Sequence, residues 1–241
     1  MSTGRKAVDP PREARELRTE ELLGRLNDVE ERNKPERLFA IGDTTLLGGR
    51  PRAAIVGARK ATELGLARAR KLARLLATRG VVVVSGLAEG IDTAAHWGAI
   101  RARGRTIGVL GCPLDVRFRQ ADADLRDVME AEHLVVSQFP SGHPVLRSNF
   151  PRRNRTMALL THATVIVEAS DSSGSLSQGW EALRLGRRLL ILKSVADDPR
   201  LTWPAEMLRY GATVLSESDL DELFDALPPP EEPGWLETLA F

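Results

Sequence analysis

Blocks of apolar residues alternate with amphipathic stretches along the chain, and this pattern predicts strands and helices in turn. Residues 53–56 are wholly apolar, as in a strand that is buried on both faces of a parallel sheet. Gly57 ends the run, and from Leu64 the apolar residues recur at helical spacing with basic residues between them. A strand, a glycine turn and a helix form the first half of a βαβ unit. We expect the rest of the fold to be arranged around this unit.

The same alternation continues to the end of the chain. Further strands are expected at residues 38–41, 81–84, 106–110, 134–137, 163–167, 188–192 and 212–215. Helices are expected from Asp92 to Gly104, at 124–132, from Arg152, at 176–185, at 205–209 and from Ser218 to about residue 227, with Asp92 and Ser218 as caps. The pattern predicts an α/β fold: a doubly wound, mostly parallel, extended Rossmann-like sheet with helices on both faces.

The N-terminal segment has a different character. Residues 1–12 are polar and end in two prolines, so we interpret them as a disordered lead. Residues 13–31 are charge-rich with a thin apolar stripe, which is typical of a solvated helix at the edge of the domain; a remnant of a separate N-terminal module is the alternative. We therefore divide the chain into residues 1–34, a Rossmann-type domain at 35–227, and a proline-rich tail at 228–241.

Composition narrows the function classes. Lys and Arg number 34 against 33 acidic residues in a chain of 241, so any basic surface for nucleic acid must be local. Cys112 is the only cysteine, which excludes an internal disulfide and a thiolate zinc cluster. No apolar run approaches about 18 residues and no signal-peptide core is present, so we predict a cytoplasmic protein without membrane contact. The histidines show no metal-ligand spacing, and no cofactor is expected.

The turn after residues 53–56 carries the first candidate chemistry. In doubly wound sheets ligands bind beyond the carboxyl ends of the strands. Arg59 and Lys60 follow Gly57 at such an end, where the start of the next helix favours an anion. The G-x-G-x-x-G fingerprint is absent, so no dinucleotide specificity follows.

A second polar turn, SDSSGS, occupies residues 170–175 after the strand at 163–167. The hydroxyls of Ser172, Ser173 and Ser175 and the backbone of Gly174 can donate hydrogen bonds to a phosphate. Serine-rich turns are also common as plain helix caps. We expect this turn and the turn at Gly57 to face one crevice.

Four arginines gather near the helix expected from Arg152: Arg147, Arg152, Arg153 and Arg155. Cations at a helix N-terminus oppose the macrodipole, so the cluster indicates a bound anion or an acidic partner such as Glu168, or else a plain solvated helix start. Glu168 and Glu181 are the carboxylates expected nearest the crevice, as structural partners of Arg155. His96 is expected to be a packed histidine.

These stretches resemble the DNA-processing protein A (DprA/Smf) family from about Leu38 to Phe224. The resemblance rests on IVGARKAT, VVSGLAEGIDTAAHWGAI, TIGVLGCPLD, FPRRNRTMA, VIVEASDSSGSL and GATVLSESDLDELF, in that order. It implies a domain that binds and protects incoming single-stranded DNA without catalysing a reaction, loads a RecA-type recombinase during natural transformation, and forms a homodimer. The family's DNA-contacting positions match Arg59 and the arginines of FPRRNR.

From the two turns, the arginines and this resemblance together we expect fifteen residues to bind DNA or phosphate. They are Gly57, Arg59, Lys60, Ser85, Gly86, Arg117, Arg119, Arg147, Arg152, Arg153, Asn154, Arg155, Ser173, Gly174 and Ser175. Phe118, Phe139 and Phe150 are the loop aromatics that could stack on a base. Leu220, Leu223 and Phe224 form an apolar stripe on the last helix that could face a second copy or pack inward.

The chain also departs from the family pattern. Arg117, Arg119 and Gln120 stand where the family tends to place aromatics, proline and a lysine, and the C-terminal winged-helix-like module of many members is missing. LOG-type nucleotide phosphoribohydrolases share the architecture and carry P-G-G-x-G-T-x-x-E; this chain keeps Gly174 and Glu181 of that pattern and has Ser177-Gln178 in place of G-T. A hydrolase using Glu181 and Arg155, and a nucleotide-sensing module of a bacterial defence system, therefore remain the alternatives.

Overall fold

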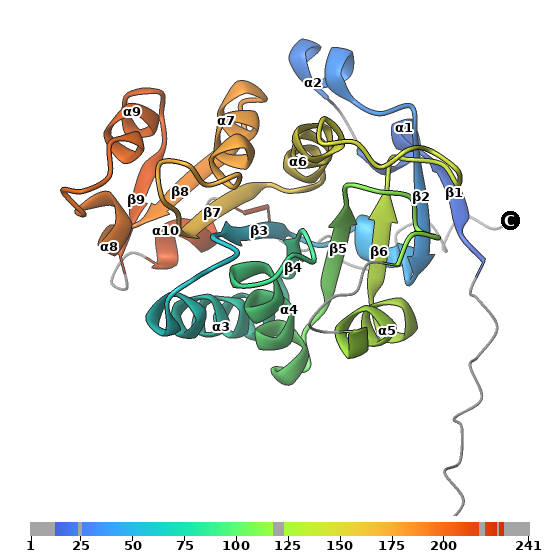
Figure 1. The fold of residues 1–241 in the computed structure, drawn as a ribbon, viewed down its shortest axis with the longest axis horizontal. Helices are drawn as coiled ribbons and strands as arrows, with labels where there is room; N and C mark the ends of the chain where they lie inside the picture. Colours follow the sequence, from blue (N-terminus) through green and yellow to red (C-terminus); the bar gives the residue numbers. More distant parts are fainter. Residues whose placement is uncertain (1–12, 24–25, 118–122, 217–219, 226, 229–241) are drawn as a thin grey trace, which may run out of the picture.

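A computed structural model describes residues 13–23, 26–117, 123–216, 220–225 and 227–228. Within them the chain forms one nine-stranded sheet in the order β1-β2-β6-β5-β4-β3-β7-β8-β9 (Figure 1). The strands are β1 (Arg15–Arg18), β2 (Arg37–Gly42), β3 (Arg52–Gly57), β4 (Val82–Ser85), β5 (Thr106–Leu110), β6 (Leu134–Ser137), β7 (Ala163–Glu168), β8 (Arg188–Leu192) and β9 (Thr213–Leu215). The seven from β6 to β9 are parallel, and β1 and β2 pair antiparallel. The predicted mostly parallel α/β sheet is confirmed.

Helices cover both faces of this sheet (Figure 1). One face carries α3 (Glu63–Thr78), α4 (Ile91–Arg101), α5 (Ala123–Glu132) and α10 (Leu220–Asp225). The other carries α6 (Asn149–Leu160), α7 (Leu176–Arg184), α9 (Trp203–Arg209) and the 3₁₀ turn η1 (Thr44–Leu47). Short helices α1 (Thr19–Leu22), α2 (Asp28–Asn33) and α8 (Lys193–Ala196) complete the described elements. None of the described helices is long and apolar enough to cross a membrane.

The alternation of side chains along each strand divides the core into two layers. Ala53 and Ile55 of β3 join the cluster beneath α3 and α4, while Ala54 and Val56 join the cluster beneath α6 and α7. All four are almost fully buried, as expected for a central parallel strand. The order of the strands reverses between β3 and β7, because β4, β5 and β6 follow on one side and β8 and β9 on the other. This switch point is where a doubly wound sheet offers its ligand crevice.

The helix predicted at residues 13–31 is wrong at its start. Arg15–Arg18 is a strand that pairs with Arg37–Ala40, and Leu17 packs against the core. Because β2 would otherwise leave unpaired backbone groups at the edge of the sheet, strand pairing overrides the helix-permissive sequence. Helix follows in two short pieces, α1 and α2, and at the start of α2 Asn27 and Glu30 form a capping box. The predicted boundary near residue 34 stays a prediction.

The apolar stripe on the last helix packs inward. Leu223 is fully buried, and the guanidinium of Arg79 lies 3.9 Å above the ring of Phe224. The stripe is therefore occupied by the core, and it provides no argument for a dimer. The predicted cap Ser218 and the predicted disordered lead lie outside the described residues.

Candidate nucleic-acid interface

A pocket of about 530 Å³ lies at the switch point of the sheet, and we call it the switch-point pocket. It is formed by the turn after β3, the loop before α4, the first turns of α6 and the turn between β7 and α7. Its lining residues are Val56, Gly57, Ala58, Arg59, Lys60, Ala88, Asp92, Phe150, Arg153, Asn154, Met157, Ser170, Ser172, Ser173, Gly174, Ser175 and Gln178. The two turns that the sequence predicted to face one crevice do so.

Two glycines allow the loops of this pocket to lie against one another. Gly90 has φ +80°, and a Cβ there would lie 2.3 Å from the carbonyl oxygen of Arg59. A Cβ on Gly57 would lie 2.7 Å from the carbonyl oxygen of Glu168. The close approach is fixed by hydrogen bonds, since Ala58 N–H donates to Glu168 O at 2.8 Å and Ile91 N–H donates to Ala58 O at 3.2 Å. Side chains at either glycine would push the loops apart.

Arg59 and Lys60 bring positive charge to the rim of the pocket. Both side chains are exposed. The guanidinium of Arg59 lies 5.9 Å from the centre of the Phe150 ring, at the outer limit of a cation–π contact. Phe150 lies in the first turn of α6 and not in a loop as predicted. It is half-buried and lines the pocket, so within the described residues it is the predicted aromatic that a base could reach.

The SDSSGS turn supplies hydrogen-bond donors opposite these cations. The hydroxyls of Ser173 and Ser175 lie 2.7 Å apart at the start of α7, and open space surrounds the α-carbon of Gly174. The backbone N–H groups of residues 176–178 already donate to carbonyls three positions earlier. An anion would therefore meet the serine hydroxyls together with the partial positive charge of the helix start.

Asp92 and Arg153 form the buried floor of the pocket. Arg153 Nη1 donates to Gly86 O at 2.8 Å and to Val109 O at 2.7 Å, and its Nε donates to Asn154 Oδ1 at 3.1 Å. Asp92 accepts hydrogen bonds from Gly86 N–H and Ala88 N–H, so it ties the preceding loop and does not cap α4 as predicted. Burial raises the pKa of the Asp92 carboxyl, and the nearby charge of Arg153 opposes that rise. Burial likewise lowers the pKa of Arg153.

Ser85 and Gly86, predicted to contact DNA, are buried and do not line the pocket. The Ser85 hydroxyl donates to Ile55 O at 2.6 Å and joins β4 to β3. A Cβ on Gly86 would lie 2.0 Å from Arg153 Nη1, so glycine is needed there for the arginine to fit. Both residues therefore stabilise the elements beneath the pocket and do not line it.

The arginine cluster is dispersed by the fold. Because α6 begins at Asn149, Arg152, Arg153 and Arg155 lie beyond its first turn, where they no longer face the helix start. Arg155 forms a two-pronged ion pair with Glu181, through Nε at 3.0 Å and Nη2 at 3.4 Å. Neither Arg155 nor Glu181 lines the switch-point pocket. The predicted pairing of Arg155 with Glu181 is confirmed. The pair does not line the crevice, where the sequence had placed it.

Glu168 is not the partner of Arg155. Its carboxylate accepts hydrogen bonds from the N–H and the hydroxyl of Thr62, at 2.8 and 2.5 Å. Thr62 is the N-cap of α3, so Glu168 holds the start of that helix against the end of β7.

The remaining predicted residues lie elsewhere. Arg147 and Arg152 are exposed and do not line the pocket, and Arg117 forms ion pairs with Asp127 and Glu130 at another cavity. Phe139 is almost fully buried beneath Arg152, whose guanidinium lies 5.1 Å from the ring centre, so it offers no face to a base. Arg119 and Phe118 lie outside the described residues.

Three residues that were not predicted from the sequence also line the pocket: Gln178, Met157 and Ala88. Gln178 is buried on the first turn of α7, and Met157 reaches the pocket from the third turn of α6. Its sequence position offered a signal for Gln178, because it is a polar residue three positions after Ser175, in the helix that follows the SDSSGS turn. Met157 and Ala88 carry no signal of that kind, because apolar residues at helical spacing predict only burial.

The family model of the DNA recombination-mediator protein A matches residues 20–227 of this chain. The DNA processing protein DprA of Bacillus subtilis is 33% identical over 194 residues, which are 80% of this chain and 65% of that protein. The chain thus spans just under two thirds of the length of this relative.

Solved structures show the same similarity. The X-ray structure of DNA processing protein A from Streptococcus pneumoniae matches with a TM-score of 0.69 and 32% identity, over 81% of this chain and 71% of that one. A structure of DNA processing protein A from Helicobacter pylori, described for its single-stranded DNA binding mode, matches with a TM-score of 0.73, over 89% of this chain and 95% of that one. At 24% identity this second match shows the fold alone.

Proposed function

Because the chain belongs to the DNA recombination-mediator protein A family, we propose that it binds single-stranded DNA in the switch-point pocket. The observation that carries the proposal is the meeting of Arg59 and Lys60 with the Ser173–Ser175 turn across one pocket. Cations and hydroxyl donors of this kind recognise the phosphate backbone, which is common to all sequences. The relatives from B. subtilis and S. pneumoniae support the proposal, since both are named for DNA processing.

The same proposal extends to the cellular role. We propose that the protein takes part in DNA processing during natural transformation, where it protects incoming strands, loads a RecA-type recombinase on them and acts as a homodimer. The relatives named for DNA processing support the first part, and the recombinase and the dimer rest on the family resemblance. No covalent step is needed for this role, so we propose that the protein is not an enzyme.

Nucleotide sensing is the second candidate, because the size of the pocket favours it. A volume of about 530 Å³ falls within the range of roughly 300–1,000 Å³ that small-molecule sites occupy. A free nucleotide could place its phosphate at the serine turn and its base near Phe150. The hydrolase alternative has less support, since Glu181 lies between Arg155 and Arg184 at a separate cavity.

Mobility shifts of single-stranded and duplex oligonucleotides, each at two salt concentrations, test the proposal. We expect preference for the single strand, an affinity that falls with salt, and no displacement by mononucleotides. Binding of a mononucleotide without binding of the strand would favour the sensor. Release of a free base from a nucleoside monophosphate, lost in Glu181→Gln, would favour the hydrolase.

A further inference from the structure

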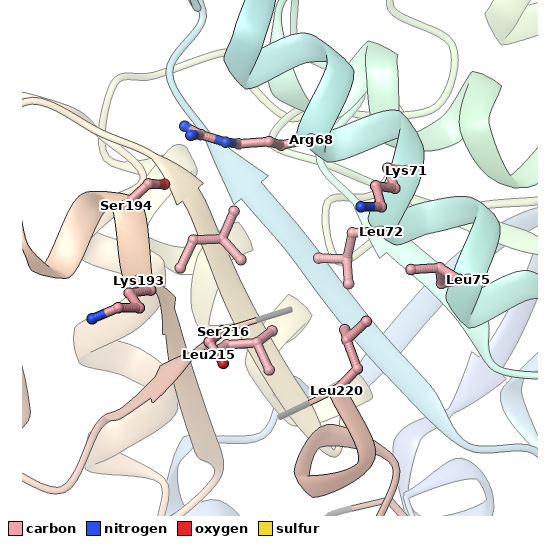
Figure 2. A pocket seen from close by; sticks show the side chains of 10 residues that line it. Arg68, Lys71, Leu72, Leu75, Lys193, Ser194, Leu215, Ser216 and Leu220 are labelled. Carbon is pink, nitrogen blue, oxygen red and sulfur yellow. The ribbon is translucent and has the colours of Figure 1, made fainter. Parts of the chain in front are cut away.

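An apolar groove of about 360 Å³ lies between α3, α10 and the carboxyl ends of β8 and β9, and we call it the α3 groove (Figure 2). Leucines form its floor and cations form its rim. The lining residues are Arg68, Lys71, Leu72, Leu75, Leu192, Lys193, Ser194, Leu215, Ser216 and Leu220. The groove is separate from the switch-point pocket, since the two have no lining residue in common.

The floor of the α3 groove is the outer surface of the core layer beneath α3. Leu72 and Leu215 are buried in that layer, and Leu220 packs against it from α10. Leu64, on the exposed side of α3, extends the apolar surface along the helix with 58% of its area exposed. Of the lining leucines, Leu75, Leu192 and Leu220 remain partly open to water. Covering them with an apolar segment would be favourable in free energy.

We propose that the α3 groove binds the C-terminal segment of the same chain, residues 229–241. Its sequence, PPEEPGWLETLAF, carries Trp235, Leu236, Leu239 and Phe241 as apolar anchors. Trp235 would occupy the leucine floor, because a tryptophan buries the largest apolar area of any side chain. This proposal does not depend on DNA binding.

Charge complementarity supports this occupant. Residues 229–241 contain Glu231, Glu232 and Glu237 and neither lysine nor arginine. The groove presents Arg68 and Lys71 from α3 and Lys193 from the opposite wall (Figure 2). Lys71 and Lys193 also interact with other groups, and Asp197 pairs with Lys193 at 2.7 Å. Arg68 has no acidic partner within the described residues. An acidic segment with apolar anchors therefore matches both the floor and the rim.

The length of the chain permits this contact. The described chain reaches Leu227, which is buried in the core layer that also contains Leu72 and Leu215. Leu220, seven residues earlier, packs against the same layer. The seven residues from Pro228 to Gly234, which link Leu227 to Trp235, can span up to roughly 23 Å when extended. So short a tether gives the segment an effective concentration on the order of millimolar at the groove. The groove would therefore be occupied even if its affinity for the free segment were low.

Disulfide trapping in the full chain tests the proposal. Cys112 is buried and will not interfere. Leu236→Cys is combined with Lys71→Cys at the groove, or with Arg74→Cys, an exposed position of the same helix that does not line the groove. Under mild oxidation we expect the 71–236 pair to close within one chain at least about fivefold faster than the 74–236 pair, because only a seated segment brings the two cysteines within bonding distance. Adding Arg68→Glu should slow the closure by roughly two- to fivefold.

Ser194→Cys on the opposite wall repeats the trap at a second exposed position, in case Lys71→Cys disturbs the fold. Equal rates for the groove pairs and the control pair would overturn the proposal. Covalent dimers as the main product would also overturn it, since the groove would then take the segment of a second copy.

Discussion

Arg153 Nη1 lies 2.8 Å from the carbonyl oxygen of Gly86, and this contact joins the second turn of α6 to the end of β4. The same nitrogen donates to Val109 O at the end of β5. One buried guanidinium therefore holds together two strand ends and a helix beneath the switch-point pocket. Its neighbour Arg152 is exposed and makes neither contact.

Arg153→Ala should destabilise the fold, because two buried carbonyls would lose their donor. We expect the free energy of unfolding to fall by about 2–4 kcal/mol, measured by urea denaturation. Arg152→Ala is the matched control and should cost no more than about 1 kcal/mol, the value of its contact with Phe139. Equal losses in the two variants would contradict a structural role for Arg153.

Arg59→Ala should weaken the binding of single-stranded DNA while leaving stability unchanged, because the side chain is exposed at the rim of the pocket. The loss of one phosphate contact should flatten the log–log salt dependence of binding by about 0.7. Lys60→Ala should act in the same direction. Arg74→Ala, on the exposed side of α3, is the control and should bind like the wild type. Unchanged binding by Arg59→Ala would remove the pocket as the DNA site and favour the nucleotide sensor.

Arg155→Ala should have the opposite profile to Arg59→Ala. Its guanidinium is held by Glu181 outside the pocket, so DNA affinity should change less than about twofold while stability falls by about 1 kcal/mol. Glu181→Gln should show a comparable loss of stability, since it removes the charge of the same pair. The grouping of Arg155 with the DNA contacts in the sequence predicts a large loss of affinity instead, so binding and denaturation curves of the two variants decide between the alternatives.

His96 should make stability fall on acidification. Its ring is fully buried, and Nδ1 lies 2.7 Å from Thr106 Oγ1, which itself donates to Val83 O. His96 Nδ1–H therefore donates to Thr106 Oγ1. A proton added at Nε2 would find no hydrogen-bond acceptor within the described residues. Burial, with a smaller contribution from His133, lowers the pKa of His96 to about 3.

The sign follows from the bound protons. Between pH 6.5 and about 3 the unfolded chain protonates His96 and the folded chain does not, so the contribution of His96 is present above pH 6.5 and is lost as the pH falls through this window. The slope should reach at most about 1.4 kcal/mol per pH unit. His96→Gln should be less stable at pH 7 but show a shallower fall between pH 6.5 and 4. Part of the fall should remain, because burial also lowers the pKa of His162 to about 4. Identical slopes in the two proteins would refute this assignment.

The sequence by itself determined the helices and strands whose local hydrophobic pattern favours the same conformation as the folded protein. Apolar runs such as residues 53–56, followed by glycine and a helical pattern, have one low-energy solution, a buried parallel strand with a crossover helix. The carboxyl ends of such strands share one edge of the sheet, so the meeting of the Gly57 and Gly174 turns followed from the same pattern.

Only the tertiary structure decided which polar residues stay available at that edge. Arg59, Arg153 and Arg155 are equally basic in the sequence, yet one is exposed, one is bonded to buried carbonyls and one is paired with Glu181. Residues 15–18 likewise became a strand because the open edge of β2 was there to pair with. In each case the outcome depends on partners that are distant along the chain, and the free energy of those contacts exceeds the local preference that the sequence pattern records.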